Sequence, residues 1–385
     1  METTQAVCTR CVIDRTVPEV EFDDKGECQF CRAHDILESI YPQGEPQGKN
    51  LSSLVEKIKA AGRGSQYDCI CGVSGGCDSS WLLHTAVKLG LRPLAVHLDN
   101  GWNTSIAVDN MRRMVSSLKV DLEVVSVDWE EFSDLQKAFL KASVSDVEVP
   151  TDVAIFSVLH KVSALKGIKY ILNGHSFRTE GIAPIGWTYM DARYIREVQK
   201  IFGTRKLRTF NNFGIREVLY YSFWKGIRVV PLLNYVSYDK AQAKESLMRD
   251  YGWEDYGGHH HESLYTKMVQ SFLLPRKFKI DKRRTSQSAR VRCGKISREA
   301  ALTELNEVPY PFEPELVEQV LARLGISEAE WRNILAAPRK TFRDYNSYFP
   351  LLRRSKQALR LACDLGFFPK LLYLKYFGQT GHDTV

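Results

Sequence analysis

The chain has 385 residues, of which 44% are hydrophobic and 26% charged, with nine cysteines and a formal net charge of +7. This composition is typical of a globular protein, and an odd cysteine count favours metal ligands and buried thiols over a disulfide framework. No apolar run reaches the roughly 18 residues of a membrane-spanning helix, and no signal-peptide pattern opens the chain, so we expect a cytoplasmic protein with an anionic ligand.

The first predicted element, residues 1–40, is a small cysteine-rich module. Its Cys-x2-Cys pairs, Cys8 with Cys11 and Cys28 with Cys31, are separated by sixteen residues, which is typical of a four-cysteine zinc site. Zinc would hold together a segment too short to build a core, because metal binding and folding are coupled in such modules. Four thiolates leave no open coordination position, so we predict a structural zinc. An iron–sulfur centre is the alternative.

One further potential ligand follows the second cysteine pair. His34 lies three residues after the last of the four cysteines. We expect it on the surface and not as a fifth ligand.

Beyond a predicted linker at 41–50, helices and strands alternate. The predicted helices are 51–61, 79–89, 105–117 and 153–166, and the predicted strands are 67–73, 94–98, 122–127, 169–172 and 229–232. Strands separated by helices of this length predict a parallel sheet covered by helices on both faces, an α/β fold. Helices then predominate, at 239–251, 261–273, 298–305, 313–336 and 348–376.

The strongest motif is the run Ser74-Gly75-Gly76-Cys77-Asp78-Ser79 between the first strand and the next helix. Small residues let the backbone wrap closely around an anion, and the free N–H groups of a helix start point towards it. The two serines can add hydroxyl donors, and Asp78 is placed to hold Mg²⁺ that bridges phosphates. No Gly-Lys-Ser/Thr follows, so this is not a Walker loop. It resembles the PP-loop of ATP pyrophosphatases, which cleave ATP between the α- and β-phosphates.

Two polar segments follow later strands at the same edge of the predicted sheet. They are His97-Leu98-Asp99-Asn100-Gly101-Trp102 and Asn173-Gly174-His175. Open α/β sheets bind ligands at this carboxyl edge. In PP-loop proteins the first segment lines the adenosine pocket and the second lies near the α-phosphate. The resemblance therefore implies an ATP site formed by Val73, Ser74, Gly75, Gly76, Asp78, Ser79, His97, Asp99, Asn100, Asn173, Gly174 and His175.

The positions of the remaining cysteines bear on the reaction. The sulfur-inserting tRNA enzymes of the PP-loop group need cysteines near the active site, but none occurs between Cys77 and Cys293. Cys69 and Cys71 are expected in the buried first strand. The species that attacks the activated substrate is therefore expected to be imported, and ammonia is the simplest choice. No Cys/His pair is placed for amide hydrolysis, so a separate glutaminase is expected.

From Cys8 to about Asn306 the chain closely resembles the N-acetyl sugar amidotransferases of bacterial surface-polysaccharide and flagellin-glycan pathways. The match includes both cysteine pairs, the loop, and segments that begin at Phe202, Tyr256 and Leu274. The resemblance implies that an acetamido group of a UDP-linked diacetamido sugar becomes an acetamidino group, because the amide oxygen is adenylated and ammonia displaces AMP. It also implies a HisH-like glutaminase and a HisF-like barrel that delivers ammonia, with no nucleic acid partner and no stable membrane insertion.

Site roles follow from this chemistry. We predict His175, Lys200 and Lys206 beside the charge that develops on the α-phosphate, and Glu180 to orient ammonia or take its proton. The predicted substrate contacts are His259, His260, Arg283 and Arg284. The predicted parts are a zinc module at 1–40, a PP-loop domain at 51–240 and a helical region at 241–385.

Three alternatives remain open from the sequence. The basic amphipathic stretch 351–376 could pack on the core, dock the ammonia-supplying partner or touch a membrane. The whole chain could instead modify tRNA. It could also sense a nucleotide without turning it over.

Overall fold

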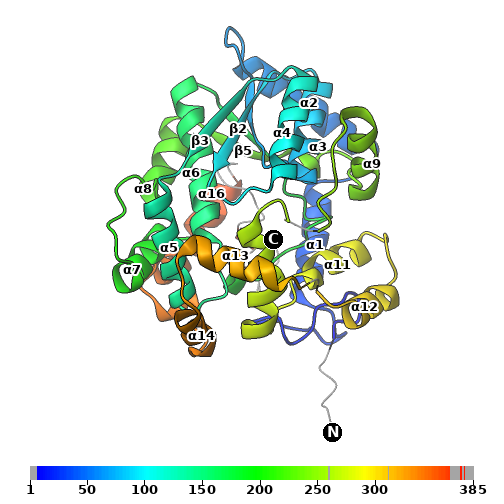
Figure 1. Cartoon of the computed structure of the whole chain (residues 1–385). Helices are drawn as coiled ribbons and strands as arrows, with labels where there is room; N and C mark the ends of the chain where they lie inside the picture. Colours follow the sequence, from blue (N-terminus) through cyan, green and yellow to red (C-terminus); the bar gives the residue numbers. More distant parts are fainter. Residues whose placement is uncertain (1–6, 259–260, 311, 365–372, 375–376, 378–385) are drawn as a thin grey trace.

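The computed structural model describes residues 7–258, 261–310, 312–364, 373–374 and 377. Its centre is a sheet of five strands in the order β3-β2-β1-β4-β5 (Figure 1). The strands are β1 (Cys69–Gly72), β2 (Pro93–Asp99), β3 (Leu122–Ser126), β4 (Tyr170–Asn173) and β5 (Arg228–Pro231). All four neighbouring pairs are parallel, so the predicted α/β fold is confirmed.

Helices cover both faces of the sheet because both faces are apolar. Alternate residues of a strand point to opposite faces, so Cys69 and Cys71 join one buried cluster and Ile70 joins another. The first cluster is covered by α3 (Cys77–Lys88), α4 (Ser105–Leu118) and α9 (Lys240–Tyr251), and the second by α6 (Val149–Lys166). The carboxyl edge of the sheet therefore opens between two helical layers.

A third and larger apolar cluster joins the N-terminal module to the helices around the sheet. It includes residues of α1 (Gln29–Ile40) and of the packed pair α5 (Trp129–Lys141) and α7 (Ala192–Phe202). The remaining α-helices are α2 (Glu45–Ala61), α8 (Ile215–Val218), α10 (Leu264–Met268), α11 (Arg283–Arg292), α12 (Arg298–Glu307), α13 (Pro314–Leu324), α14 (Glu328–Ala336), α15 (Phe349–Arg354) and α16 (Lys356–Asp364). Two π-helices, Leu219–Trp224 and Val269–Phe278, and three 3₁₀ turns, Ile185–Trp187, Leu232–Asn234 and Phe342–Asp344, complete the described elements.

Several predicted boundaries are wrong for local reasons. The predicted linker 41–50 becomes helical at Glu45, because Pro46 stands in the first turn, where its missing N–H costs nothing. The predicted helix 313–336 is two helices, since Gly325 ends α13 with a φ of +63°. The sequence patterns missed α1, α5, α7, α8 and α11. The end of the predicted helix 348–376 lies largely outside the described residues.

Within the part of the chain that the structure describes, no helix is both long and apolar enough to cross a membrane.

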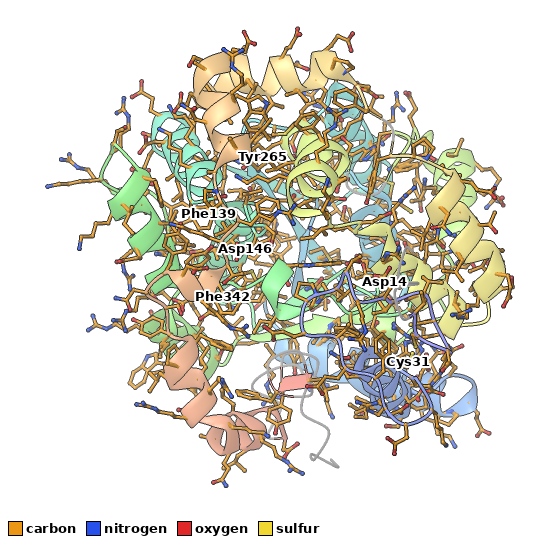
Figure 2. The ribbon with its side chains drawn as sticks, turned by 90° about the horizontal axis from the view of Figure 1, so that it is seen from below. Asp14, Cys31, Phe139, Asp146, Tyr265 and Phe342 are labelled. Carbon is orange, nitrogen blue, oxygen red and sulfur yellow. The ribbon has the colours of Figure 1, made fainter. Side chains whose placement is uncertain are left out.

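Asp146 is a buried acid in the large apolar cluster, in the same interior region as Phe139 and Phe342 (Figure 2). The hydroxyl of Tyr194 donates to its Oδ1 at 3.0 Å, and its Oδ2 has no partner among the described residues. Burial raises the pKa of this carboxyl to about 7. A folded-state pKa above the unfolded value means that folding takes up a proton.

The contribution of Asp146 to stability should therefore be fully present below the ordinary pKa of aspartate, and it should be lost as pH rises through about 7. The free energy of unfolding should fall by on the order of 4 kcal/mol at most. Asp146→Asn is expected to remove this fall, which thermal unfolding from pH 5 to 8 measures. Asp134→Asn is the matched control, because hydrogen bonds outweigh burial and lower the pKa of Asp134. Parallel pH profiles for wild type and Asp146→Asn would contradict this account.

Candidate active site and metal centre

The loop between β1 and α3 has the form that close approach to an anion requires. Gly75 has a φ of +78°, and a Cβ there would lie 2.0 Å from the carbonyl oxygen of Ala107. Ser79 Oγ accepts from the backbone N–H of Ser74 at 3.2 Å and donates to the Gly76 carbonyl at 3.1 Å. The loop is thus folded onto the first turn of α3, whose N-cap residue, Gly76, has no side chain to cap the helix. Free N–H groups at a helix start are a site for phosphate.

Asp78, in the first turn of α3, is the centre of a half-buried polar group. Lys240 Nζ lies 2.6 Å from its Oδ2, and the Tyr238 hydroxyl donates to its Oδ1 at 2.5 Å. Burial alone would lower the pKa of Lys240, but attraction to Asp78 outweighs it and the pKa is raised. Burial and Asp78 together raise the pKa of Tyr238. The site therefore holds a permanent cation beside the carboxylate that we predicted to bind Mg²⁺.

The turn after β4 lies against the same helix start. A Cβ on Gly174 would lie 3.2 Å from the backbone oxygen of Asp78. His175 Nδ1 is 2.5 Å from Glu180 Oε2, and the Glu180 charge helps to raise the pKa of Lys240. The structure thus brings together three predicted catalytic residues, Asp78, His175 and Glu180.

His97 has a different position from the one predicted. Its Nδ1 donates to the carbonyl of Val73 at 2.8 Å, and its Nε2 lies 2.9 Å from Asn103 Nδ2. Both ring nitrogens are used inside the protein. His97 therefore fixes the end of β2 to the start of the phosphate loop and is not placed to bind adenosine directly.

Three other predicted ATP residues shape their own turns. Asp99 Oδ1 accepts from the N–H of Gly101 at 3.0 Å, and Asn100 Oδ1 from Trp102 at 3.2 Å. Asn173 Oδ1 accepts in the same way from the N–H two residues further on, at 2.7 Å. Such side-chain turns position the backbone of the carboxyl edge.

The structure does not bring Lys200 and Lys206 to Asp78. Lys200 is exposed in the last turn of α7, and Lys206 is exposed in the loop that follows. That loop is held to α5, because Asp134 accepts from the backbone N–H groups of Thr204 and Arg205 at 2.9 Å. The cation at the phosphate loop is Lys240 instead.

The predicted substrate arginines are engaged within the protein. Arg283 pairs with Asp281 at 2.7 Å, and its guanidinium stacks on the Tyr310 ring. Arg284 pairs with Asp14 at 2.9 Å. This geometry does not support direct substrate contacts by either one. His259 and His260 lie outside the described residues.

Tyr256 and Glu262, which sequence analysis did not assign to the site, contact the phosphate loop. The Tyr256 hydroxyl accepts from the N–H of Cys77 at 3.2 Å, and Glu262 Oε1 accepts from Ser74 Oγ at 3.3 Å. A Cβ on Gly76 would lie 2.9 Å from Glu262 Oε1. The run that begins at Tyr256 could have indicated these residues, but the prediction concentrated on the histidines between them.

The four N-terminal cysteines have the geometry of a metal site. Their sulfurs are separated by 3.8 Å for Cys8 and Cys31, 3.6 Å for Cys11 and Cys28, and 3.7 Å for Cys28 and Cys31. Four sulfurs at about 2.3 Å from a tetrahedral Zn²⁺ would be roughly 3.8 Å apart. All four side chains are buried. The residues therefore fit a structural zinc.

Arg292 supplies a second observation for negative charge at this cluster. Its guanidinium donates to the sulfurs of Cys31 and Cys11 at 3.3 and 3.2 Å, and Cys28 lies 3.8 Å away. Burial would lower its pKa, but attraction to the cysteine sulfurs outweighs burial and the pKa is raised. A buried cation that touches three sulfurs fits a metal–thiolate cluster, which has a net negative charge.

Residues 276–298, which are rich in arginine and lysine, have a structural role. Arg298 donates to the backbone carbonyls of Cys8 and Cys11, and Arg284 donates to that of Val12. Helices α11 and α12 therefore hold the cysteine module against the rest of the chain. The expectation that His34 is a surface residue is wrong: it is buried, and its Nε2 is 4.0 Å from the sulfur of Cys293.

One segment of the chain matches a known protein family model. Residues 262–357 match the family model described as "LPS biosynthesis protein WbpG-like, C-terminal domain". This segment is therefore similar to the WbpG-like C-terminal domain. The match covers about a quarter of the chain and confirms, over that quarter, the predicted resemblance to surface-polysaccharide proteins. The WbpG-like segment begins with Glu262, which touches the phosphate loop, and it contains α11 and α12, which hold the cysteine module.

No curated protein matches the chain significantly. Among solved structures, the NMN synthetase of Francisella tularensis has a TM-score of 0.32 and 12% identity, over 74% of this chain and 95% of that one. The NH3-dependent NAD synthetase of Campylobacter jejuni has a TM-score of 0.29 and 14% identity, over 76% of this chain and 98% of that one. A predicted tRNA methyltransferase subunit of Methanocaldococcus jannaschii has a TM-score of 0.28 and 11% identity, over 47% and 75%.

Proposed function

We propose that the protein is an ATP-pyrophosphatase-type amidotransferase of surface-polysaccharide synthesis that converts an acetamido group of a nucleotide-linked diacetamido sugar into an acetamidino group. The observation that carries this proposal is the Asp78, Lys240, His175 and Glu180 group at a glycine loop without a Walker lysine. The WbpG-like match supplies the pathway class.

The reaction follows from the charges of the site. The amide oxygen of the sugar attacks the α-phosphorus of ATP and pyrophosphate leaves. Ammonia then adds to the activated carbon and AMP leaves, so C=O becomes C=NH₂⁺. Asp78 would hold Mg²⁺, which neutralises phosphate charge, and Lys240 stabilises the charge that develops on the α-phosphate. We propose that His175, held by Glu180, accepts a proton from ammonia as it adds.

The state of two cysteines outside the four-cysteine cluster, Cys77 in the loop and Cys293, supports ammonia over sulfur as the attacking species. Burial raises the pKa of Cys77 to about 11 and also raises the pKa of Cys293. Both side chains are therefore thiols, and not thiolates, at neutral pH, and a persulfide relay needs thiolates. We propose that ammonia comes from a separate HisH-like glutaminase through a HisF-like barrel.

With ATP, Mg²⁺ and a UDP-linked diacetamido uronic acid, the protein alone should use ammonium salts to form the acetamidino sugar, AMP and pyrophosphate. Glutamine alone should be inert until a glutaminase is added. The ammonium-driven rate should rise as pH increases above neutral, because only unprotonated ammonia can attack. Chromatography of the nucleotides and mass spectrometry of the sugar measure these outcomes.

Reactions without sugar or without ammonium are the controls. ADP as the main product would contradict the assignment of the loop. Thiolation of tRNA by the isolated chain would show that the tRNA-modifying alternative is correct.

A further inference from the structure

An apolar face lies on α8 and the π-helix that continues it. It consists of the exposed side chains Ile215, Leu219, Tyr220, Phe223 and Trp224. In a π-helix residues four and five apart share a face, so the last four of these point the same way. Tyr221 turns inward, where it stacks on Phe213 and lies 5.6 Å from the His160 ring. Trp224 is 82% exposed, which is unusual for so large an aromatic side chain.

A second exposed segment, formed by α15 and α16, is both basic and apolar. Leu351 and Leu361 are exposed to 51% and 60%. Arg353, Arg354 and Arg360 are exposed beside them. Long basic side chains next to exposed leucines are typical of helices that lie on a membrane surface.

The residues that precede the two segments are both bound to the start of α7. Asn212 Nδ2, just before α8, donates to the carbonyl of Ala192 at 2.9 Å. The N–H of Tyr348, just before α15, donates to Asp191, and the Arg193 guanidinium lies 5.7 Å from the Tyr348 ring. The apolar face and the basic helices are therefore anchored to neighbouring residues of one turn.

The charges of the two segments indicate the chemistry of the partner. Over residues 215–225 and 349–364 there are six basic residues, Arg216, Lys225, Arg353, Arg354, Lys356 and Arg360, and two acidic residues, Glu217 and Asp364, so the net charge is 6 − 2 = +4. Glu217 is engaged locally, because its carboxylate accepts from the N–H of Gly214 at 2.8 Å. Apolar side chains surrounded by cations match an anionic phospholipid surface, where apolar groups enter the headgroup layer and cations attract the lipids.

We propose that α8, the following π-helix and α15–α16 form a surface that binds reversibly to anionic phospholipid bilayers. Exposed isoleucine and leucine beside the aromatic residues favour a lipid over RNA, which needs stacking platforms and a charged groove. The π-helix ends just before β5, at the amino edge of the sheet, whereas the phosphate loop lies at the carboxyl edge. The proposal does not depend on the amidotransferase assignment.

Co-sedimentation with phosphatidylcholine vesicles, with and without about 30% phosphatidylglycerol, tests the proposal on the full chain. We expect binding only to the anionic vesicles, and a loss of binding as salt increases. The double substitution Phe223→Ser with Trp224→Ser should lower the partition coefficient about tenfold or more. Arg353→Glu with Arg354→Glu should lower it about thirtyfold.

Met248→Ser is the matched control, because Met248 is an exposed apolar residue of α9 outside this surface. It should bind vesicles as the wild type does, and all variants should keep the wild-type unfolding temperature. The proposal fails if the wild type ignores anionic vesicles at low salt, or if the serine variant still binds them fully. It also fails if the same substitutions abolish a dimer in sedimentation velocity, or abolish binding to a homopolymeric RNA that competes fully with the vesicles.

Discussion

Replacing Lys240 with alanine should lower kcat for AMP formation by about a thousandfold without unfolding the protein. Lys240 lies 2.6 Å from Asp78, and its raised pKa keeps it charged at any ordinary pH. Loss of one donor aimed at developing charge in a water-poor site costs about 10²–10³ in rate. Steady-state AMP production at saturating ATP measures the effect, and thermal unfolding verifies that the variant is folded.

Lys200→Ala and Lys206→Ala are the matched controls, because both side chains are exposed lysines on the α7 side of the chain. We expect each to keep AMP formation within about threefold of the wild type, as for most surface substitutions. Lys240→Arg should recover part of the lost rate, since it restores the charge but not the shape. If Lys200→Ala or Lys206→Ala matched the loss in Lys240→Ala, the sequence prediction would be right and the assignment to Lys240 wrong.

The sheet and the phosphate loop could be predicted because their signals are local. A short apolar strand, a run of small residues and a helix start follow one another within residues 69–79. The cation of the site gives no such signal, since Lys240 and Asp78 are 162 residues apart and meet only through the packing of α9 on α3. Tyr238 and Glu262 reach the loop across similar separations.

Helix α5 was missed although its sequence carries a helical signal. Its buried apolar residues recur at the spacing of one helix face, at Phe132, Leu135, Phe139 and Leu140. What the sequence could not show is the role of its buried acids. Glu131 accepts from the backbone N–H groups of Thr209 and Phe210, and Asp134 accepts from the loop after α7, so their partners lie 70 to 79 residues away.

Helix α11 was missed because its sequence has no apolar spacing. It is almost entirely polar, so its composition resembles a solvated loop or an anion site. Its arginines bind the cysteine module instead, and this partner is more than 250 residues away in the chain. A charge run indicates a negative partner, but not whether that partner is a substrate or another part of the same protein.

The cysteine module gives the largest expected effect on stability. Cys28→Ser should abolish the binding of about one zinc per chain and lower the unfolding temperature by roughly ten degrees or more, because zinc binding in such modules supplies folding free energy. Elemental analysis measures the metal and calorimetry the stability. A strong chelator should shift the wild type in the same direction. Iron in place of zinc would favour the iron–sulfur alternative, and retained metal with an unchanged unfolding temperature would contradict the structural role.

Arg292→Met distinguishes a metal–thiolate cluster from four neutral thiols, because it removes a buried cation that donates to the cysteine sulfurs and leaves all four ligands in place. If the cluster holds zinc, its net negative charge then lies buried without compensation, and breaking such a buried pair costs about 3–5 kcal/mol. Arg292→Met should therefore unfold at a lower temperature and release zinc to a chelator faster than the wild type. Arg290→Met is the matched control on the same helix, since Arg290 forms a more exposed ion pair with Glu304 at 3.5 Å and should matter little. Four neutral thiols carry no charge that the guanidinium could compensate. In that case Arg292→Met would be as stable as Arg290→Met, because a methionine side chain is readily buried beside protonated cysteines.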